Sequence, residues 1–204
     1  MKAEARHGDL PCTIRNLCER LCAIPAGSFS RERVLEEIGR TVIDPVSLQK
    51  YMFFSPVHYT RNLIYRCDLF EVVAIGWDVG QVAPIHNHRG QECWMGVPAG
   101  RLEVRNFRLR EHDPVTRTCS LDPTDTYLLD PEHPAAVNPE EPIHSVHNLD
   151  SFGERAISVH VYSRPFDRCE VYFLDEGRYM EMELCYTSRY GELCDGEIAK
   201  PSAC

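Results

Sequence analysis

The chain has 204 residues, of which 43% are hydrophobic and 26% are charged, and this composition is typical of a globular protein with a hydrophobic core. Its formal net charge of −9 excludes the basic surface that non-specific binding of nucleic acid requires. The longest apolar stretch, residues 70–79, contains two acidic residues and has the length of a strand, so we expect no membrane span.

Residues 1–9 are polar and mixed in charge, and they lack the basic and then apolar layout of a signal peptide. We therefore expect a cytoplasmic protein whose 10 cysteines are reduced thiols and not a disulfide framework. Cys18 and Cys22 have a helical spacing, and we expect both to be buried on one helix face as small hydrophobic side chains.

Residues 1–50 carry the pattern of helices. Residues 13–24 place their apolar side chains on one stripe with a helical period, and a Pro-Ala-Gly sequence ends this helix. Ser30 is an N-cap candidate for a second helix over residues 31–41, and Asp44 opens a short helical turn. We expect this helical segment to pack on the outside of the following β-structure.

From Tyr59 onward, short runs of β-branched and aromatic residues alternate with Gly, Pro, Asn and Asp clusters, which predicts strands. The predicted strands are residues 62–65, 70–77, 92–97, 102–109, 127–129, 156–162, 170–173 and 179–186. Residues 175–177, Asp-Glu-Gly, form the expected hairpin turn between the last two strands. The sequence therefore predicts a mainly β protein, a single domain of residues 1–204 in which N-terminal helices precede a β-barrel over residues 59–190.

A His-x-His pair is the first candidate for a functional site. In a strand, residues i and i+2 project from one face, so His86 and His88 can reach one metal ion. A surface turn is the alternative, because Pro84 and Asn87 favour turns. The pair alone does not decide between the two.

The spacing around the pair favours a metal site. Five residues separate Gly80 from His86, four residues separate His88 from Cys93, and six more lead to Gly100. This spacing resembles the first motif of the cupin superfamily, in which the two histidines bind a metal. The resemblance implies a small, jelly-roll-like β-barrel.

A second motif supplies a third histidine. Residues 139–148 read Pro-x-Glu-x-x-His-x-x-x-Asn and resemble the second cupin motif, with Glu141 in place of the usual glycine. The resemblance implies that His144 is the third metal ligand.

The fourth cupin ligand is a glutamate, and its place is ambiguous in this sequence. Strand alternation favours Glu92 on the inner face, whereas the six-residue gap before Gly100 favours Cys93. With Glu92 the site has three histidines and a carboxylate. With Cys93 it has three neutral histidines, which leave the full charge of the metal and open positions for an anionic chelate such as a thiolate.

Four blocks resemble one cupin family in particular, the cysteine dioxygenases. They are Tyr59-Thr60-Arg61-Asn62, His86-x-His88 with Cys93, His144-x-Val146-x-Asn148, and Ser158-x-His160-x-Tyr162 followed by Pro165, Phe166, Asp167 and Cys169, in order within residues 51–190. The resemblance implies Fe(II) on His86, His88 and His144. It also implies an enzyme that converts L-cysteine and O2 to cysteine sulfinic acid by adding both oxygen atoms to the sulfur.

The resemblance further implies which residues bind the substrate. Arg61 would hold the substrate carboxylate through a bidentate contact that a lysine does not reproduce. Tyr59, Ser158 and Cys169 would complete the substrate site.

Three residues would be catalytic. Ser158, His160 and Tyr162 alternate along one strand and so share one face, which suits a hydrogen-bonded relay that ends at the Tyr162 hydroxyl. Cys93 occupies the position that members of the mammalian type join to this tyrosine. A Cys93–Tyr162 thioether crosslink is therefore a hypothesis of the resemblance.

Two alternatives remain open from the sequence. Mercaptopropionate dioxygenases resemble this family but often carry glutamine in place of Arg61 and lack the cysteine that corresponds to Cys93, so both residues favour L-cysteine as substrate. A non-oxidative cupin such as an isomerase would use Glu92 as a fourth ligand, with Mn, Zn or Ni.

The oligomeric state is also open, because the sequence is compatible with a monomer and with a homodimer.

The other histidines are not predicted to bind a metal. His58 adjoins Tyr59 and is expected near the mouth of the pocket, and His147 is expected to face away from His144. His7, His112 and His133 are expected in exposed loops.

Overall fold

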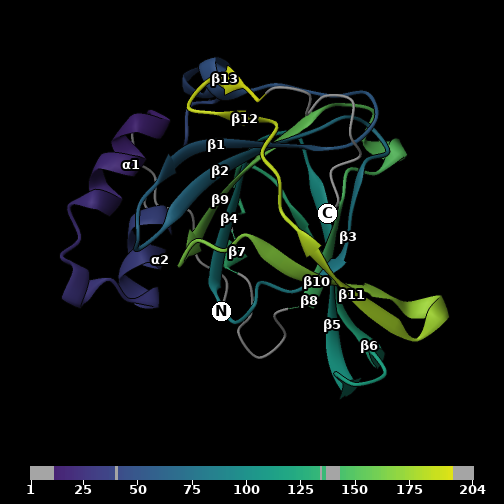
Figure 1. The fold of residues 1–204 in the computed structure, drawn as a ribbon. Helices are drawn as coiled ribbons and strands as arrows, with labels where there is room; N and C mark the ends of the chain where they lie inside the picture. Colours follow the sequence, from purple (N-terminus) through teal and green to yellow (C-terminus); the bar gives the residue numbers. More distant parts are fainter. Residues whose placement is uncertain (1–11, 40, 134, 137–142, 195–204) are drawn as a thin grey trace.

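The structure is a computed structural model that describes residues 12–39, 41–133, 135–136 and 143–194 (Figure 1). Its helical elements are α1 (Ile14–Cys22), η1 (Ala26–Ser28), α2 (Arg31–Gly39), η2 (Pro45–Tyr51), η3 (Asp150–Phe152) and η4 (Leu174–Glu176), where η marks a 3-10 helix. Its strands are β1 (Thr60–Arg66), β2 (Glu71–Trp77), β3 (Val82–His86), β4 (Glu92–Ala99), β5 (Leu102–Asp113), β6 (Thr118–Leu129), β7 (Ala135–Ala136), β8 (Ile143–His147), β9 (Ala156–Ser163), β10 (Arg168–Phe173), β11 (Arg178–Glu183), β12 (Ser188–Arg189) and β13 (Glu192–Leu193). Within the described residues, no helix is long and apolar enough to cross a membrane.

The strands form two sheets. The first has seven strands in the order β13-β12-β1-β2-β9-β4-β7, and the second closes on itself in the order β10-β11-β6-β5-β8-β3. Side chains of both sheets, among them Val73, Met95, Val104 and Val146, share one buried cluster, so the sheets pack against each other. The prediction of a mainly β, cupin-type fold preceded by helices is therefore confirmed.

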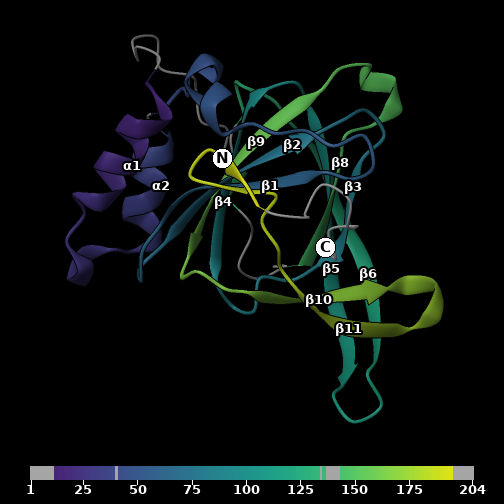
Figure 2. The ribbon, with the colours of Figure 1, turned by 45° about the horizontal axis from the view of Figure 1, so that its top comes forward.

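Helices α1 and α2 cover the outer face of the seven-stranded sheet (Figures 1 and 2). Thr13 starts α1 with a capping box, in which its hydroxyl accepts the N–H of Asn16 at 3.2 Å. The buried stripe of α1 shares a core cluster with the sheet: Ile14, Leu17, Cys18, Leu21, Phe70, Val72, Trp94, Val159 and Val161. Cys18 is buried as predicted, whereas Cys22, the last residue of the helix, is exposed.

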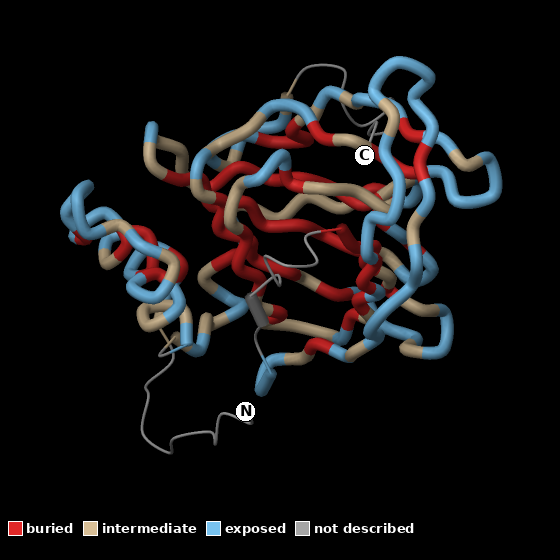
Figure 3. The backbone as a smooth tube through the Cα atoms, turned by 90° about the horizontal axis from the view of Figure 1, so that it is seen from below, coloured by how far each residue is buried: buried red, intermediate tan, exposed pale blue. Residues whose placement is uncertain are grey.

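Strands β1, β2 and β9 of the seven-stranded sheet are mostly buried, and strand alternation sorts their side chains between the two faces of the sheet (Figure 3). All seven residues of β2 are buried. Val73 and Trp77 of β2 point into the space between the sheets, and Val72 and Ala74 point toward the helices. A polar side chain on the inner face of this sheet is therefore shielded from solvent and needs a partner inside the protein.

The structure adds strands that the sequence pattern did not predict. Strands β3 and β8 are absent from the predicted strands, because β3 contains a proline and both strands carry histidines in place of alternating apolar residues. Strand β6 begins at Thr118, whereas the predicted strand begins at residue 127. The first part of β6 is largely exposed and polar, so it lacks the apolar pattern on which the prediction depends. The turn at residues 175–177 is confirmed, with Gly177 at φ 60°, but β11 ends at Glu183 and the chain continues toward Tyr186 outside a strand.

The packing of α1 on the sheet gives a test of the fold. Leu21→Ala removes a fully buried side chain, and we expect it to lower the free energy of unfolding by about 2–5 kcal/mol. Leu35→Ala in α2 is the matched control, because Leu35 is 43% exposed, and its effect should stay within about 0.5 kcal/mol. Urea unfolding followed by circular dichroism measures both values. Equal effects of the two substitutions would contradict the packing described.

Candidate metal centre

The three predicted histidines meet where β3 pairs with β8. His86 is the last residue of β3, His88 follows two residues later, and His144 lies on β8 directly opposite His86 in the antiparallel register. One ring nitrogen of each histidine lies within 4.8 Å of the others. The predicted grouping is therefore observed, and three imidazoles at this separation can share one metal ion.

The chemistry of these imidazoles fits a metal ion. Burial lowers the pKa of His86 to about 4 and the pKa values of His88 and His144 well below their usual range, so all three rings are neutral and able to donate a lone pair. Both ring nitrogens of His88 and the Nδ1 atom of His144 are buried without a hydrogen-bond partner among the described residues. A bound metal would satisfy one nitrogen of each ring, which removes most of the cost of burying them.

The ring of His86 is oriented by a backbone group. Its Nδ1 atom lies 2.8 Å from the carbonyl oxygen of Pro84, so the Nδ1–H donates to this carbonyl. The proton on Nδ1 leaves the lone pair of Nε2 for a metal. A hydrogen bond from the ring nitrogen that does not bind the metal fixes the tautomer and the orientation of a metal-binding histidine.

Glu92 is not part of this group. Its side chain lies on the outer side of β4 and forms an ion pair with Arg31 of α2 at 3.6 Å. Trp94, two residues on, packs on the same outer side against the helices. The expectation from alternation that Glu92 faces inward is wrong, because Cys93 takes the inner face opposite Tyr162 of β9.

The predicted relay lies on the inner face of β9. The Trp77 indole N–H donates to the Ser158 hydroxyl oxygen at 2.9 Å, and this hydroxyl lies 2.8 Å from Nε2 of His160. Because an indole nitrogen only donates, the Ser158 O–H remains available for His160. His160 Nδ1 then carries the proton and donates to the Tyr162 hydroxyl at 3.1 Å, which leaves the phenol O–H for a group in the pocket.

Burial and charge keep this relay neutral. Desolvation and the nearby positive charge of Arg61 lower the pKa of His160 to about 3. Burial also raises the pKa values of Tyr162 and of the Cys93 thiol, so both remain protonated at neutral pH. The Cys93 sulfur lies 3.9 Å from His160 Nδ1. Cys93, His160 and Tyr162 are thus brought together as the sequence predicted.

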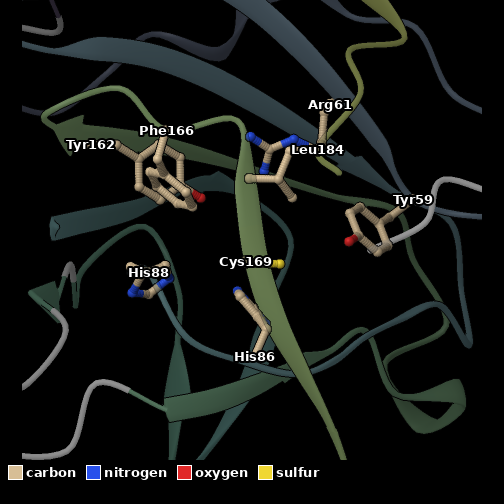
Figure 4. A pocket seen from close by; sticks show the side chains of 8 residues that line it. All are labelled: Tyr59, Arg61, His86, His88, Tyr162, Phe166, Cys169 and Leu184. Carbon is tan, nitrogen blue, oxygen red and sulfur yellow. The ribbon is translucent and has the colours of Figure 1, made fainter. Parts of the chain in front are cut away.

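A small pocket opens beside His86 and His88 (Figure 4). Its walls are Tyr59, Arg61, His86, His88, Tyr162, Phe166, Cys169 and Leu184. Figure 4 shows the guanidinium of Arg61 across the pocket from His86 and His88. Ser158, which was predicted to bind substrate, is fully buried between Trp77 and His160 and is not among the lining residues.

Arg61 is a buried cation in the pocket wall, with 4% of its surface exposed. Its strand, β1, is held by Thr187, whose N–H donates to the Arg61 carbonyl oxygen at 2.7 Å. The guanidinium carbon lies 5.8 Å from the ring centre of Tyr162 and 5.7 Å from that of Tyr186, within cation–π range. A fixed guanidinium with little water around it is a strong binding site for a carboxylate.

The remaining histidines lie elsewhere. His147 hydrogen-bonds Ser145 at 2.8 Å, and His133 is exposed as predicted. His112 was expected in a loop but lies in β5, where its ring stacks on Tyr179 at 4.3 Å. His58 is half-buried beside Tyr59 and is not a lining residue of the cavity. His7 and Glu141 lie outside the described residues.

Two wall residues, Phe166 and Leu184, were not predicted as site residues. Phe166 belongs to the block after β9 that resembles the family, so its motif position was a usable signal. Leu184 lies within the strand predicted over residues 179–186 but follows β11 in the structure, and no motif marks it as a site residue. Trp77 was read as part of a strand, and its hydrogen bond to Ser158 depends on the pairing of β2 with β9.

The fold and the three histidines define a cupin with a metal centre, and comparison with known proteins identifies the family. The sequence model of the family described as cysteine dioxygenase type I matches residues 32–175. Cysteine dioxygenase type 1 of Danio rerio is 26% identical over 191 residues, which cover 93% of each chain, and that of Homo sapiens is 27% identical over 183 residues, which cover 89% of each chain. Among solved structures, a Klebsiella pneumoniae protein with a double-stranded beta-helix domain is 20% identical with a TM-score of 0.44, over 57% of this chain and 81% of that chain. The chain therefore belongs to the cysteine dioxygenase type I family.

Metal binding tests the ligand set. His144→Ala should abolish stoichiometric binding of Fe(II), because two imidazoles without the third do not close the site. Glu92→Gln should retain full binding, since Glu92 contacts Arg31 and not the histidines. Elemental analysis of protein loaded under anaerobic conditions measures both, with His133→Ala as a control at an exposed histidine. If Glu92→Gln loses as much metal as His144→Ala, the result would favour the alternative site in which Glu92 is a fourth ligand.

Proposed function

We propose that the protein is an Fe(II)-dependent cupin thiol dioxygenase that converts L-cysteine and O2 to cysteine sulfinic acid. The observation that carries this proposal is a group of three neutral imidazoles, two of which line the same pocket as a buried arginine. Membership of the cysteine dioxygenase type I family supports the same chemistry.

The ligand set suits an anionic chelating substrate. Three neutral imidazoles bring no negative charge, so a dipositive metal bound to them keeps its full charge for a substrate thiolate. When bound, Fe(II) would hold the thiolate and amine of cysteine and supply the redox chemistry with dioxygen. The electrons for this oxidation come from the substrate sulfur, so no reducing cosubstrate is needed.

Arg61 would hold the other end of the substrate. Its guanidinium lies across the pocket from His86 and His88, so the two ends of a short thiol that carries a carboxylate would face the imidazoles and the cation. A planar guanidinium binds a carboxylate through two parallel hydrogen bonds, which fixes the orientation of the substrate as well as its charge. Cysteine has this carboxylate, and Phe166 and Leu184 would exclude water around it.

Tyr162 would act on the reacting sulfur and oxygen through its hydroxyl. His160 occupies one lone pair of the phenol oxygen, and Figure 4 shows the hydroxyl directed toward the interior of the pocket. A phenol that stays protonated can donate a hydrogen bond to developing negative charge on oxygen or sulfur. Tyr162 is therefore proposed as a catalytic residue and His160 as the residue that orients it.

The isomerase alternative has no support in this geometry. It required Glu92 as a ligand, and that carboxylate lies on the outer face beside Arg31. The choice between L-cysteine and 3-mercaptopropionate rests on Arg61 and Cys93, and both favour L-cysteine.

Oxygen uptake tests the proposed activity. Fe(II)-loaded protein should consume O2 on addition of L-cysteine, with a higher kcat/KM for L-cysteine than for 3-mercaptopropionate. Arg61→Lys should lower kcat/KM for L-cysteine by about 10- to 100-fold, since it keeps the charge but loses the bidentate contact. Arg105→Lys, at an exposed arginine, is the matched control. A preference for 3-mercaptopropionate would overturn the substrate assignment, and no oxygen uptake with either thiol would overturn the activity.

The thioether crosslink has its own test. Cys93 and Tyr162 lie directly opposite each other in β4 and β9, so a bond from Sγ to the phenol ring needs no change of register. The bond replaces one S–H and one ring C–H, with dioxygen as the acceptor of the two hydrogens. Intact-protein mass after turnover should therefore be lower by two hydrogen atoms. Cys119→Ser should keep this deficit and Cys93→Ser should lose it, and an unmodified mass in fully active protein would refute the crosslink.

A further inference from the structure

One wall residue of the site, Leu184, comes from a segment that lies beyond the family match. The family model ends at residue 175, whereas Leu184 lines the cavity and the chain then runs along β1. Strand β12 pairs with β1 in parallel, with Asn62 opposite Ser188 and Leu63 opposite Arg189 (Figure 1). This C-terminal segment, residues 184–194, therefore lies against the strand that carries Arg61.

Tyr186 connects this segment to Arg61. Its ring is within cation–π range of two guanidinium groups, with the Arg61 carbon 5.7 Å and the Arg189 carbon 5.3 Å from the ring centre. Its hydroxyl donates to Glu71 Oε2 at 2.5 Å and accepts from Arg66 Nη1 at 2.8 Å. Each polar and aromatic part of this buried side chain thus contacts a charged group.

Glu71 is the buried anion of this group. Its side chain is fully buried on β2, and its Oε2 lies 3.3 Å from Arg66. Its other oxygen, Oε1, has no hydrogen-bond partner among the described residues. Burial raises the pKa of Glu71 and outweighs the lowering by Tyr186, Arg61 and Arg66, and the charge of Arg61 is thus among those that act on this carboxyl.

We propose that Tyr186 is a positioning residue for Arg61, which rests on the proposed role of Arg61 in binding the substrate carboxylate. The ring of Tyr186 supports the guanidinium. The hydroxyl fixes Glu71 beside Arg66, so that the Glu71 charge does not compete with the substrate carboxylate for Arg61.

A role in packing alone predicts something different. Phenylalanine has the same ring and would pack in the same space, so only the hydroxyl separates the two accounts. Removal of the hydroxyl releases Glu71 Oε2, and a buried carboxylate without this hydrogen bond is stabilised by closer contact with Arg61 as well as with Arg66. The loss should therefore depend on the charge of Glu71.

The experiment is a double-mutant cycle on Fe(II)-loaded protein with L-cysteine as substrate. Tyr186→Phe should raise KM about tenfold, which corresponds to about 1.4 kcal/mol, and should change kcat less than about twofold. Glu71→Gln should lower KM by about two- to threefold, and the double variant should resemble Glu71→Gln more than Tyr186→Phe. Tyr190→Phe, at an exposed tyrosine of the same segment, is the matched control and should behave as wild type.

Each other outcome overturns the assignment. An unchanged KM in Tyr186→Phe, a fall in kcat alone, or a double variant as weak as Tyr186→Phe would leave Tyr186 a packing residue. Thermal unfolding of each variant identifies a folding defect, and if Tyr186→Phe fails to fold, a raised KM in Glu71→Gln is the contradicting result. Wild type and Tyr190→Phe without oxygen uptake would instead refute the proposed function itself.

Discussion

The antiparallel pairing of β3 with β8 is the constraint on which the site depends. It places His86 opposite His144, and the chain returns two residues later to add His88 to the same point. The imidazoles of His88 and His144 are buried and neutral. Both ring nitrogens of His88 and the Nδ1 atom of His144 lack hydrogen-bond partners within the described residues, which is a costly arrangement without a metal. The cupin barrel supplies the hydrophobic support that holds this arrangement in place.

The two sheets divide the chemistry between them. His86 and His144 come from the closed sheet and His88 from the loop after β3, whereas Arg61, Cys93 and Tyr162 come from the inner face of the seven-stranded sheet. Because that sheet is covered by helices on its outer face, alternation along each strand decides whether a side chain faces the space between the sheets or the helices. The same alternation turns Glu92 away from the histidines and leaves them without a carboxylate.

Local pattern in the sequence predicted much of this arrangement. The His-x-His spacing, the second motif with His144 and the alternation of Ser158, His160 and Tyr162 all correspond to neighbours in space. The orientation of Glu92 was not predictable from its own strand, because the register of β4 against β9 decides it. Strands β3 and β8 were missed for a related reason, since functional histidines replaced the apolar residues that mark a strand. Leu184 and Tyr186 reach the site only through the path of the chain after β11, which no local pattern encodes.

The central claim is that three neutral imidazoles and Arg61 direct dioxygen to the sulfur of a carboxylated thiol. Mass spectrometry of the product formed from L-cysteine under ¹⁸O-labelled dioxygen tests it most directly. The account predicts cysteine sulfinic acid in which both sulfinate oxygens carry the label. A product with one labelled oxygen, an unlabelled sulfinate, or cystine as the main product would contradict it.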